Sequence, residues 1–400
     1  MNLQITAFGS SLQNWWKETP KPFAEAFNPR HNSIGFMRIC LASLVIVSHS
    51  YPLGGHYGAE ILSRISRGQE TLGSIAVSGF FILSGFLIAG SYDHLKSMPR
   101  FLWHRILRIM PAFWTSLVVV ALGFGAIFFY HYHHNFIGYL SATSGGPLSY
   151  IGQNFFLTMK QYDISNLSSH LVYPSAFDGS LWTLIYEFKC YLLVGALGFF
   201  GLIKSSRRLI VASLIGVYAL YIANLAVPGV AAALMPPLKD VEMLKLLTVF
   251  LAGSVFYVYR DKIILSSRYF VLSLLLLLLT TRLGGLAIFV PPLLCYVLMY
   301  AATYLPIKSF DRKYDLSYGV YIYAFPVQQT FSLYGLNHLN IAIYCLLVLV
   351  CTLPLAFLSY VVIEKPSMKL KNIDFNPKII GRFYGQLSRK RSSLFARLSN

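Results

Sequence analysis

The stretch Tyr269–Pro306, YFVLSLLLLLLTTRLGGLAIFVPPLLCYVLMYAATYLP, decides the fold class of this chain, because it holds two long apolar runs and only one charged residue, Arg282. A helix that crosses a lipid bilayer needs roughly 20 mostly apolar residues. Both runs fit that length, and Arg282, Gly284 and Gly285 mark a turn between them. The stretch therefore predicts two consecutive transmembrane helices joined by a short connection.

The rest of the chain repeats this apolar pattern. Of its 400 residues, 56% are hydrophobic and only 12% are charged, and the mean hydropathy is +0.58, whereas a soluble domain carries about 25% charged residues. The chain is therefore predicted to be an all-α integral membrane protein with about ten transmembrane helices. The predicted spans, bounded by charged or turn residues, are 34–51, 72–90, 106–130, 181–203, 209–229, 243–259, 269–285, 286–306, 314–334 and 341–363.

Positive charge is distributed unevenly around these spans, and the distribution predicts the topology. Cytoplasmic loops of membrane proteins are enriched in Lys and Arg. With a cytoplasmic N-terminus, about 25 of the 33 Lys and Arg residues fall in inner segments and about five in outer segments. Both termini are therefore predicted to be cytoplasmic. The net charge of +18 then reflects topology and contact with anionic lipid, so we expect the lipid bilayer as a partner and no nucleic acid.

Three segments are expected along the chain. Residues 1–33 are polar and interrupted by prolines, unlike a signal peptide, and are predicted to form a cytoplasmic N-terminal segment. Residues 34–367 form the predicted transmembrane domain, and residues 368–400 a basic cytoplasmic tail. No metal site is expected, because His131, His133 and His134 lack an acidic partner nearby and lie in a predicted outer loop. The sequence leaves the oligomeric state open.

Ionisable side chains inside membrane spans are costly and therefore mark candidate functional sites. The first span contains Arg38 and His49, eleven positions apart. Eleven steps of about 100° bring both side chains to one helix face, and a rise of about 1.5 Å per residue separates them by roughly 16 Å. This face would carry a cation near its cytoplasmic end and a general base near its outer end. Alternatively, Arg38 reaches lipid phosphate and His49 lies at the interface without a chemical role.

The fourth span begins with LWTLIYEFKCY at residues 181–191 and contains an acidic side chain. Glu187 and Tyr191 are four positions apart and share a helix face, whereas Lys189 points elsewhere. A carboxylate at this depth must face protein or water, so Glu187 is expected to orient His49 or to bind hydroxyl groups of a substrate. A structural ion pair with a neighbouring helix is the alternative.

Two further motifs precede this helix. Arg105 and Arg108, in RILRIMP at 105–111, lie three positions apart and suit a phosphorylated ligand, although topology alone would also place arginines there. The run SGFFILSGFL at 78–87 includes Ser84 and Gly85. Small residues in a membrane helix permit the close approach of another helix, or the passage of a thin ligand.

In this order, the motifs resemble the membrane-bound acyltransferase 3 family. The resemblance covers residues 34 to about 367. It implies a multi-pass enzyme of the plasma membrane (the inner membrane in bacteria) that transfers an acyl group, commonly acetyl, to a hydroxyl of a sugar or polysaccharide such as lipopolysaccharide or exopolysaccharide. The matching elements are Arg38 and His49 with ten residues between them, SGFFILSGFL, RILRIMP, LWTLIYEFKCY, LSYGVYIY at 316–323 and EKP at 364–366.

For the donor, the resemblance implies acetyl-CoA or another acyl-CoA at the cytoplasmic face, as a substrate and not as a permanently bound cofactor. Arg105 and Arg108 would bind its phosphates, and Arg38 would line its entrance. The pantetheine arm would pass Ser84 and Gly85 toward the outer side of the membrane.

For the acceptor, a carbohydrate or glycolipid beyond the membrane, the resemblance implies catalysis by His49. His49 would remove the proton of the acceptor hydroxyl, a task suited to imidazole near neutral pH. Glu187 would fix the imidazole tautomer or contact the acceptor. Trp182 would pack against sugar, and Tyr191 and Tyr321 are further candidates for contact with substrate.

A transporter or exporter of a small solute or sugar lipid is the main alternative. Arg38, His49 and Glu187 would then form a proton-coupled pathway, which accounts equally well for ionisable residues inside the membrane. Two observations favour an enzyme. The motif RILRIMP lies at the predicted inner end of the group formed by Arg38, His49 and Glu187, and the sequence has no recognisable internal repeat.

Overall fold

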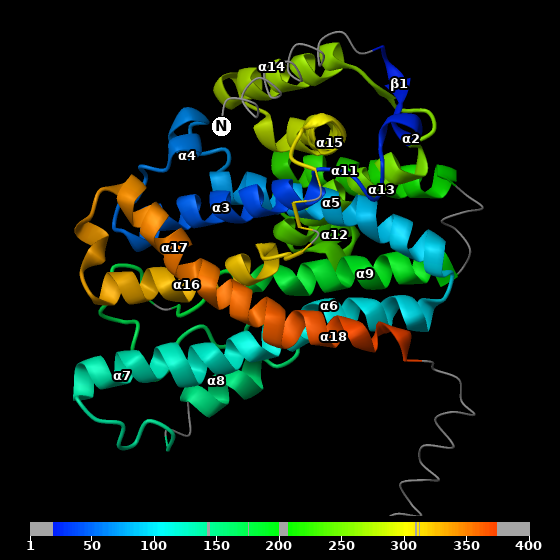
Figure 1. Ribbon diagram of the computed structural model, residues 1–400. Coiled ribbons are helices and arrows are strands. Elements are labelled where there is room, and N and C mark those ends of the chain that lie inside the picture. The colour runs from blue at the N-terminus through cyan, green and yellow to red at the C-terminus, as the bar shows by residue number, and fades with distance from the viewer. Residues whose placement is uncertain are drawn as a thin grey trace, which may run out of the picture.

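The computed structural model describes residues 19–141, 145–174, 176–199, 207–308, 310–311 and 313–373, so parts of the predicted N-terminal segment (1–18) and tail (374–400) lie outside the described residues. Within these ranges the chain is a bundle of long helices with one two-stranded sheet (Figure 1). The elements are β1 (Lys21–Pro22), α2 (Phe23–Ala26), α3 (Ile34–Leu53), α4 (Ile61–Ile65), α5 (Leu72–Leu95), α6 (Met98–Val118), η1 (Val119–Phe124), α7 (Gly125–His133), α8 (Pro147–Asn154), η2 (Leu181–Thr183), α9 (Leu184–Phe199), α11 (Arg207–Ala226), α12 (Val230–Leu234), η3 (Pro236–Leu238), α13 (Val241–Val258), β2 (Ile264–Leu265), α14 (Ser267–Leu283), α15 (Leu286–Tyr304), α16 (Ser317–Leu333), η4 (Leu336–His338), α17 (Ile341–Ser359), η5 (Tyr360–Glu364), α18 (Lys365–Lys369) and η6 (Leu370–Asn372).

Eight helical segments of the described chain are long and apolar enough to cross a membrane. The remaining two predicted spans, 269–285 and 314–334, lie in α14 and α16, which have 17 residues each. Such a helix is about 25 Å long, at the short end for a hydrocarbon core of about 30 Å. The protein is thus a multi-pass helical membrane protein, and the count of ten transmembrane helices stays a prediction. The eight segments are Ile34–Leu53, Leu72–Leu95, Met98–His133, Leu181–Phe199, Arg207–Ala226, Val241–Val258, Leu286–Tyr304 and Ile341–Asn372.

The turn predicted between the seventh and eighth spans is present. Helix α14 ends at Leu283 and α15 begins at Leu286. Between them, Gly284 and Gly285 have φ angles of 101° and 84°. A side chain would strain the backbone in this region of φ, so the glycine pair permits the tight connection.

Helices α5 and α13 form the most extensive helix pair, because glycines let their backbones meet. A Cβ atom at Gly85 would lie 1.9 Å from the carbonyl oxygen of Phe250, and one at Gly253 would lie 2.1 Å from that of Ile82. Small residues at such positions allow close packing of membrane helices. The neighbouring Ser84 lines a cavity instead.

Helix α3 lies beside α5, α16 and α17 (Figure 1), and α16 is buried along most of its length. Gln328 Nε2 of α16 donates hydrogen bonds to the carbonyl oxygen of Ile46 at 2.9 Å and to Ser50 Oγ at 2.8 Å. Polar groups buried among membrane helices need such partners. These bonds fix the last turns of α3, which include His49.

The segment between α7 and η2 also packs on α16. Gln329 Nε2 donates hydrogen bonds to the carbonyl oxygens of Tyr173 at 2.9 Å and Ala176 at 2.5 Å. Gly179 lies so close to the Phe325 ring that a Cβ atom would approach it within 2.7 Å. The segment therefore covers the end of α16 that contacts the last turns of α3.

Candidate active site

Three cavities follow helix α3 from its first residue to its last turns. Counted from the first residue of α3, the first and second cavities both have Arg38 and Leu87 in their linings, and the second and third cavities both have Val77 and Tyr321. Together they trace an interrupted path along the helix. We name them by lining residues: the vestibule (Phe27, Arg30, His94, Tyr257, Arg260), the arginine cavity (Arg105, Arg108, Glu187, Tyr191) and the histidine cavity (His49, Trp182, Lys245).

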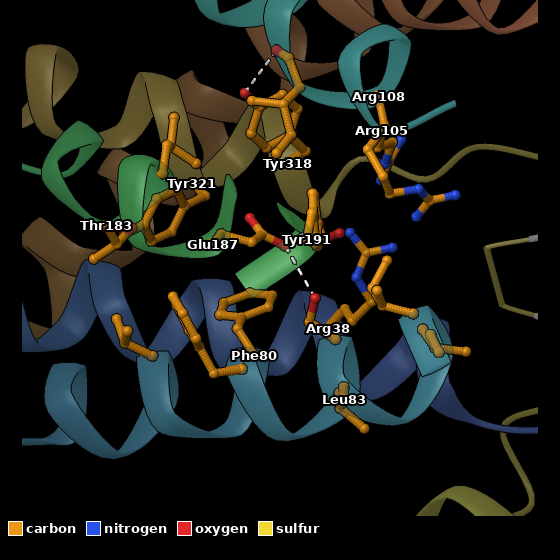
Figure 2. A pocket seen from close by; sticks show the side chains of 18 residues that line it. Arg38, Phe80, Leu83, Arg105, Arg108, Thr183, Glu187, Tyr191, Tyr318 and Tyr321 are labelled. Atoms are coloured by element: carbon orange, nitrogen blue, oxygen red, sulfur yellow. Dashed lines mark hydrogen bonds between the residues drawn. The ribbon is translucent and has the colours of Figure 1, made fainter. Parts of the chain in front are cut away.

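The arginine cavity lies between α3, α5, α6, α9 and α16 and has a volume of about 860 Å³, including the space at its open mouth (Figure 2). Glu187 and Tyr191 of α9 both line it, as their spacing predicted, and Tyr191 Oη donates a hydrogen bond to Glu187 Oε1. Ser84 Oγ donates to the same oxygen over 3.2 Å. In the described chain Glu187 forms no salt bridge, so its charge is stabilised by two hydroxyl groups.

Two of the three arginines around this cavity are paired with carboxylates. Arg38 Nη1 lies 2.7 Å from Asp315 Oδ2, and Arg108 Nη2 lies 2.5 Å from the same oxygen. Arg108 Nη1 also lies 3.3 Å from Glu364 Oε2, whose side chain is almost fully buried. Asp315 lies just before α16. This network therefore connects α3, α6 and α16 through paired charges.

Arg105 differs from Arg108, because it forms no salt bridge in the described part of the chain. Its guanidinium carbon lies 5.8 Å from the ring centroid of Tyr191 and 5.9 Å from that of Phe101. Its Nε is buried without a hydrogen-bond partner among the described residues. A guanidinium group with an unmet donor is suited to an anionic ligand. Arg105 thus offers charge to the cavity, whereas Arg108 belongs to the helix framework.

His49 lies in the histidine cavity, toward the opposite end of α3 from Arg38. Its ring contacts Phe325 edge to face, with 5.4 Å between ring centroids. Neither ring nitrogen has a hydrogen-bond partner in the described chain. The imidazole is therefore free to accept a proton from a ligand in this cavity.

Lys245 and Glu70 form a buried ion pair at the histidine cavity. Lys245 Nζ lies 2.7 Å from each carboxylate oxygen of Glu70 and 2.6 Å from Ser74 Oγ. All three ammonium donors are thus satisfied. Ser74 and Lys245 line the cavity, so the pair forms a fixed polar wall whose two charges compensate each other.

Tyr321 stands between the arginine cavity and the histidine cavity. Its Oη donates a hydrogen bond to the carbonyl oxygen of Ser180 at 2.9 Å and makes a second hydrogen bond, of 2.6 Å, with Thr183 Oγ1. Its ring contacts Phe80 edge to face, and Figure 2 shows Tyr321, Thr183 and Phe80 on one side of the arginine cavity. These contacts fix the Tyr321 ring between the two cavities, so a ligand that extends from one cavity into the other must pass it.

Nine of the ten candidate residues from the sequence line the arginine or histidine cavity, and Gly85 does not. Gly85 faces the α13 backbone, so it serves helix packing and leaves no room for a ligand on that side. Glu187 and His49 line different cavities, and no contact joins them. Glu187 therefore does not orient the imidazole in this structure. Spacing along a helix shows which residues share a face, but not which neighbour that face meets.

Asp178, Lys245 and Asp315 are among the charged residues at or beside the site that sequence reasoning missed. Lys245 interrupts the apolar run 243–259, and Asp315 directly precedes LSYGVYIY. An ionisable residue inside or beside a span was the signal available for both. Asp178 lies in a polar segment, and nothing in that segment reveals that its side chain is fully buried.

Asp178 precedes η2 and lies outside the membrane-spanning helices. Its Oδ1 accepts hydrogen bonds from Ser180 N at 3.0 Å and Ser180 Oγ at 2.6 Å, whereas Oδ2 has no partner among the described residues. Burial raises the pKa of Asp178 from 3.8 to about 7, and the bonds from Ser180 offset only part of this rise. The adjacent Gly179 packs against Phe325, which contacts His49, so this carboxyl group lies behind the wall of the histidine cavity.

We expect the contribution of Asp178 to the stability of the protein to fall as pH rises from about 4 to about 7. In this window native Asp178 keeps a proton that the unfolded chain has lost, and above about pH 7 the contribution becomes constant. Asp178→Asn should remove on the order of 4 kcal/mol of this pH dependence. Thermal unfolding of both purified proteins in detergent between about pH 4.5 and 8 measures the difference. Parallel pH profiles would contradict the assignment.

Comparison with known proteins shows to which family the chain belongs. The acyltransferase domain model of the acyltransferase 3 family matches residues 31–361. The chain belongs to the acyltransferase 3 family. An O-acetyl transferase of Shigella phage Sf6 is 29% identical over 351 residues, which cover 84% of this chain and 96% of that protein. Nodulation protein 10 of Rhizobium leguminosarum bv. viciae is 27% identical over 383 residues, which cover 88% and 96%.

No solved structure matches the chain. Membership of the acyltransferase 3 family makes the protein an acyltransferase, and its apolar helices make it a multi-pass membrane protein. An acyltransferase needs an acyl donor and an acceptor. The three cavities along α3 are therefore the parts of the described chain in which to look for both substrates.

Proposed function

We propose that this acyltransferase 3 protein is a membrane O-acetyltransferase that moves an acetyl group from cytoplasmic acetyl-CoA to a hydroxyl of a sugar or glycolipid at the outer side of the membrane. Family membership and the name of the phage relative support transfer to oxygen. The observation that carries the proposal is the placement of Arg38 and His49 in different cavities along one continuous helix. A donor bound near Arg38 would extend its acyl group toward the base at the other end.

At the donor end, Arg105 would bind a phosphate group of acetyl-CoA, because no carboxylate forms a salt bridge with it in the described chain. Ser84 and Glu187 line the same cavity. Their oxygens would accept hydrogen bonds from the amide groups of the pantetheine arm. The thioester would then pass Tyr321 into the histidine cavity.

At the acceptor end, His49 would act as the general base. It would take the proton of the acceptor hydroxyl while the hydroxyl oxygen bonds to the carbonyl carbon of the thioester. The carbon–sulfur bond then breaks, and the CoA thiolate leaves and recovers the proton as a thiol. The unpartnered imidazole suits this role, and the direct transfer requires no protein nucleophile. Trp182 would pack against the apolar face of the sugar.

The proposal includes a topology. We place both termini in the cytoplasm, include α14 and α16 among ten transmembrane helices, and assign the protein to the plasma membrane. The concentration of Lys and Arg in the inner segments supports this orientation. Arg38 would then lie near the cytoplasm and His49 near the outer surface.

Two assays test the proposed reaction. Purified protein in detergent should release thiol from acetyl-CoA when an acceptor sugar is present. Mass spectrometry of surface polysaccharide from cells with and without the protein should show an acetyl group that depends on it. Movement of a sugar lipid across the membrane without thiol release from acetyl-CoA would overturn the proposal in favour of a transporter.

Arg105 and Arg108 are expected to respond differently to truncation. Arg105→Ala should weaken acetyl-CoA binding about tenfold, with little loss of stability, because it removes one charge-assisted contact to phosphate. Arg108→Ala should lower the unfolding temperature, because it leaves Asp315 and Glu364 without a shared partner. Calorimetric binding and thermal unfolding of both variants measure the two effects. Equal losses of acetyl-CoA affinity with equal stability would contradict this division of roles.

A further inference from the structure

The vestibule has a wall built by residues that precede the family match. The match begins at residue 31, and we call residues 19–30 the N-terminal strap. Its strand β1 pairs antiparallel with β2. Phe23 N donates a hydrogen bond to the carbonyl oxygen of Ile263, and Ala24 N to that of Arg260, both at 2.8 Å. The strap is thus fixed to the segment that follows α13.

Aromatic rings form one side of the vestibule. Phe23 is fully buried and stacks on Phe27, with 4.8 Å between ring centroids. Phe27 meets Phe86 edge to face at 5.5 Å, and Phe86 meets Tyr257 at 5.6 Å. These four residues all line the vestibule. Such a set of rings offers an apolar aromatic surface against which a purine base can pack.

Basic side chains form another side. The Arg260 guanidinium carbon lies 4.1 Å from the Tyr257 ring centroid, and Nη1 donates a hydrogen bond to the carbonyl oxygen of Tyr257 at 2.8 Å. Arg30 lies at the exposed end of the strap. Neither arginine forms a salt bridge among the described residues. His94 also lines the vestibule, and Asp311 is the acidic residue in its lining.

We propose that the vestibule binds the nucleotide end of coenzyme A, with adenine on the aromatic side and the 3′-phosphate between Arg30 and Arg260. The inference rests on the proposed function, because it extends the donor site. The vestibule has a volume of about 1560 Å³, including the space at its open mouth, and adjoins the arginine cavity at Arg38 and Leu87. A nucleotide in the vestibule therefore leaves the pyrophosphate and pantetheine to the arginine cavity.

The test compares three ligands that differ in the parts assigned to the vestibule. Coenzyme A, dephospho-CoA without the 3′-phosphate, and pantetheine without the nucleotide are titrated calorimetrically into the purified full-length protein in detergent. The wild type should bind coenzyme A about tenfold more tightly than dephospho-CoA. Arg30→Ala and Arg260→Ala should bring this ratio toward one and leave pantetheine binding unchanged. Arg260→Gln provides a longer polar side chain if Arg260→Ala does not fold.

Arg268→Ala is the matched control. Arg268 is an exposed arginine at the start of α14, and it does not line the vestibule. It should keep the wild-type ratio. Equal affinity of the wild type for coenzyme A and dephospho-CoA, or an equal effect of Arg268→Ala, would overturn the vestibule inference alone. If the wild type binds neither coenzyme A nor pantetheine and releases no thiol from acetyl-CoA, the proposed function fails with it.

Discussion

Replacing His49 with glutamine is expected to lower acetyl transfer about a thousandfold while the protein still folds and binds acetyl-CoA. Glutamine retains a polar group of similar reach but cannot take up a proton near neutral pH. The His49 ring has no hydrogen-bond partner in the described chain and contacts Phe325 through a ring edge. Its replacement therefore leaves no buried hydrogen-bond partner unpaired, so the variant should lose catalytic activity and not stability.

Transfer to the acceptor and affinity for acetyl-CoA are measured side by side on the same preparations. His338→Gln is the control, since His338 is an exposed histidine outside the three cavities. It should keep wild-type activity. If His49→Gln transfers acetyl groups at a rate within about tenfold of the wild type, another group must accept the proton. If it loses acetyl-CoA affinity as well, His49 acts in donor binding and not as the base.

Features confined to one segment could be predicted from the sequence. The apolar runs located the helices, and Gly284 and Gly285 located the turn between α14 and α15, because both depend on local composition. The shared face of Glu187 and Tyr191 followed from helical periodicity and is present as a hydrogen bond. Arg38 and His49 likewise line cavities along one helix.

Pairings between distant segments could not be predicted. Asp315 forms salt bridges with Arg38 and Arg108, 277 and 207 positions away, and these distances in sequence carry no periodic signal. The same limit affects Lys245, which meets Glu70 from 175 positions away. Packing decided the role of each residue. Arg105 and Arg108 belong to one motif, but packing places Arg108 in salt bridges and leaves Arg105 without one in the described chain.

The second large effect concerns the α5–α13 pair. Gly85→Val is expected to cost more than about 4 kcal/mol and to leave little folded protein in the membrane. A Cβ atom at this position would lie 1.9 Å from a backbone carbonyl oxygen of Phe250, and backbone cannot rotate away as a flexible side chain can. The helices would have to separate, which would also pull Gly253 away from Ile82, where the reciprocal contact is 2.1 Å.

Gly216→Val is the matched control for this prediction, because Gly216 also lies in an apolar helix but a Cβ atom there would meet nothing within 4 Å among the described residues. Both variants are compared by the amount of monodisperse protein extracted in detergent and by its unfolding temperature. Gly216→Val should resemble the wild type. If Gly85→Val is extracted in wild-type amounts, unfolds at the wild-type temperature and has lost only acetyl-CoA binding, then Gly85 contacts the donor, as the motif first indicated, and the tight helix pair does not depend on it.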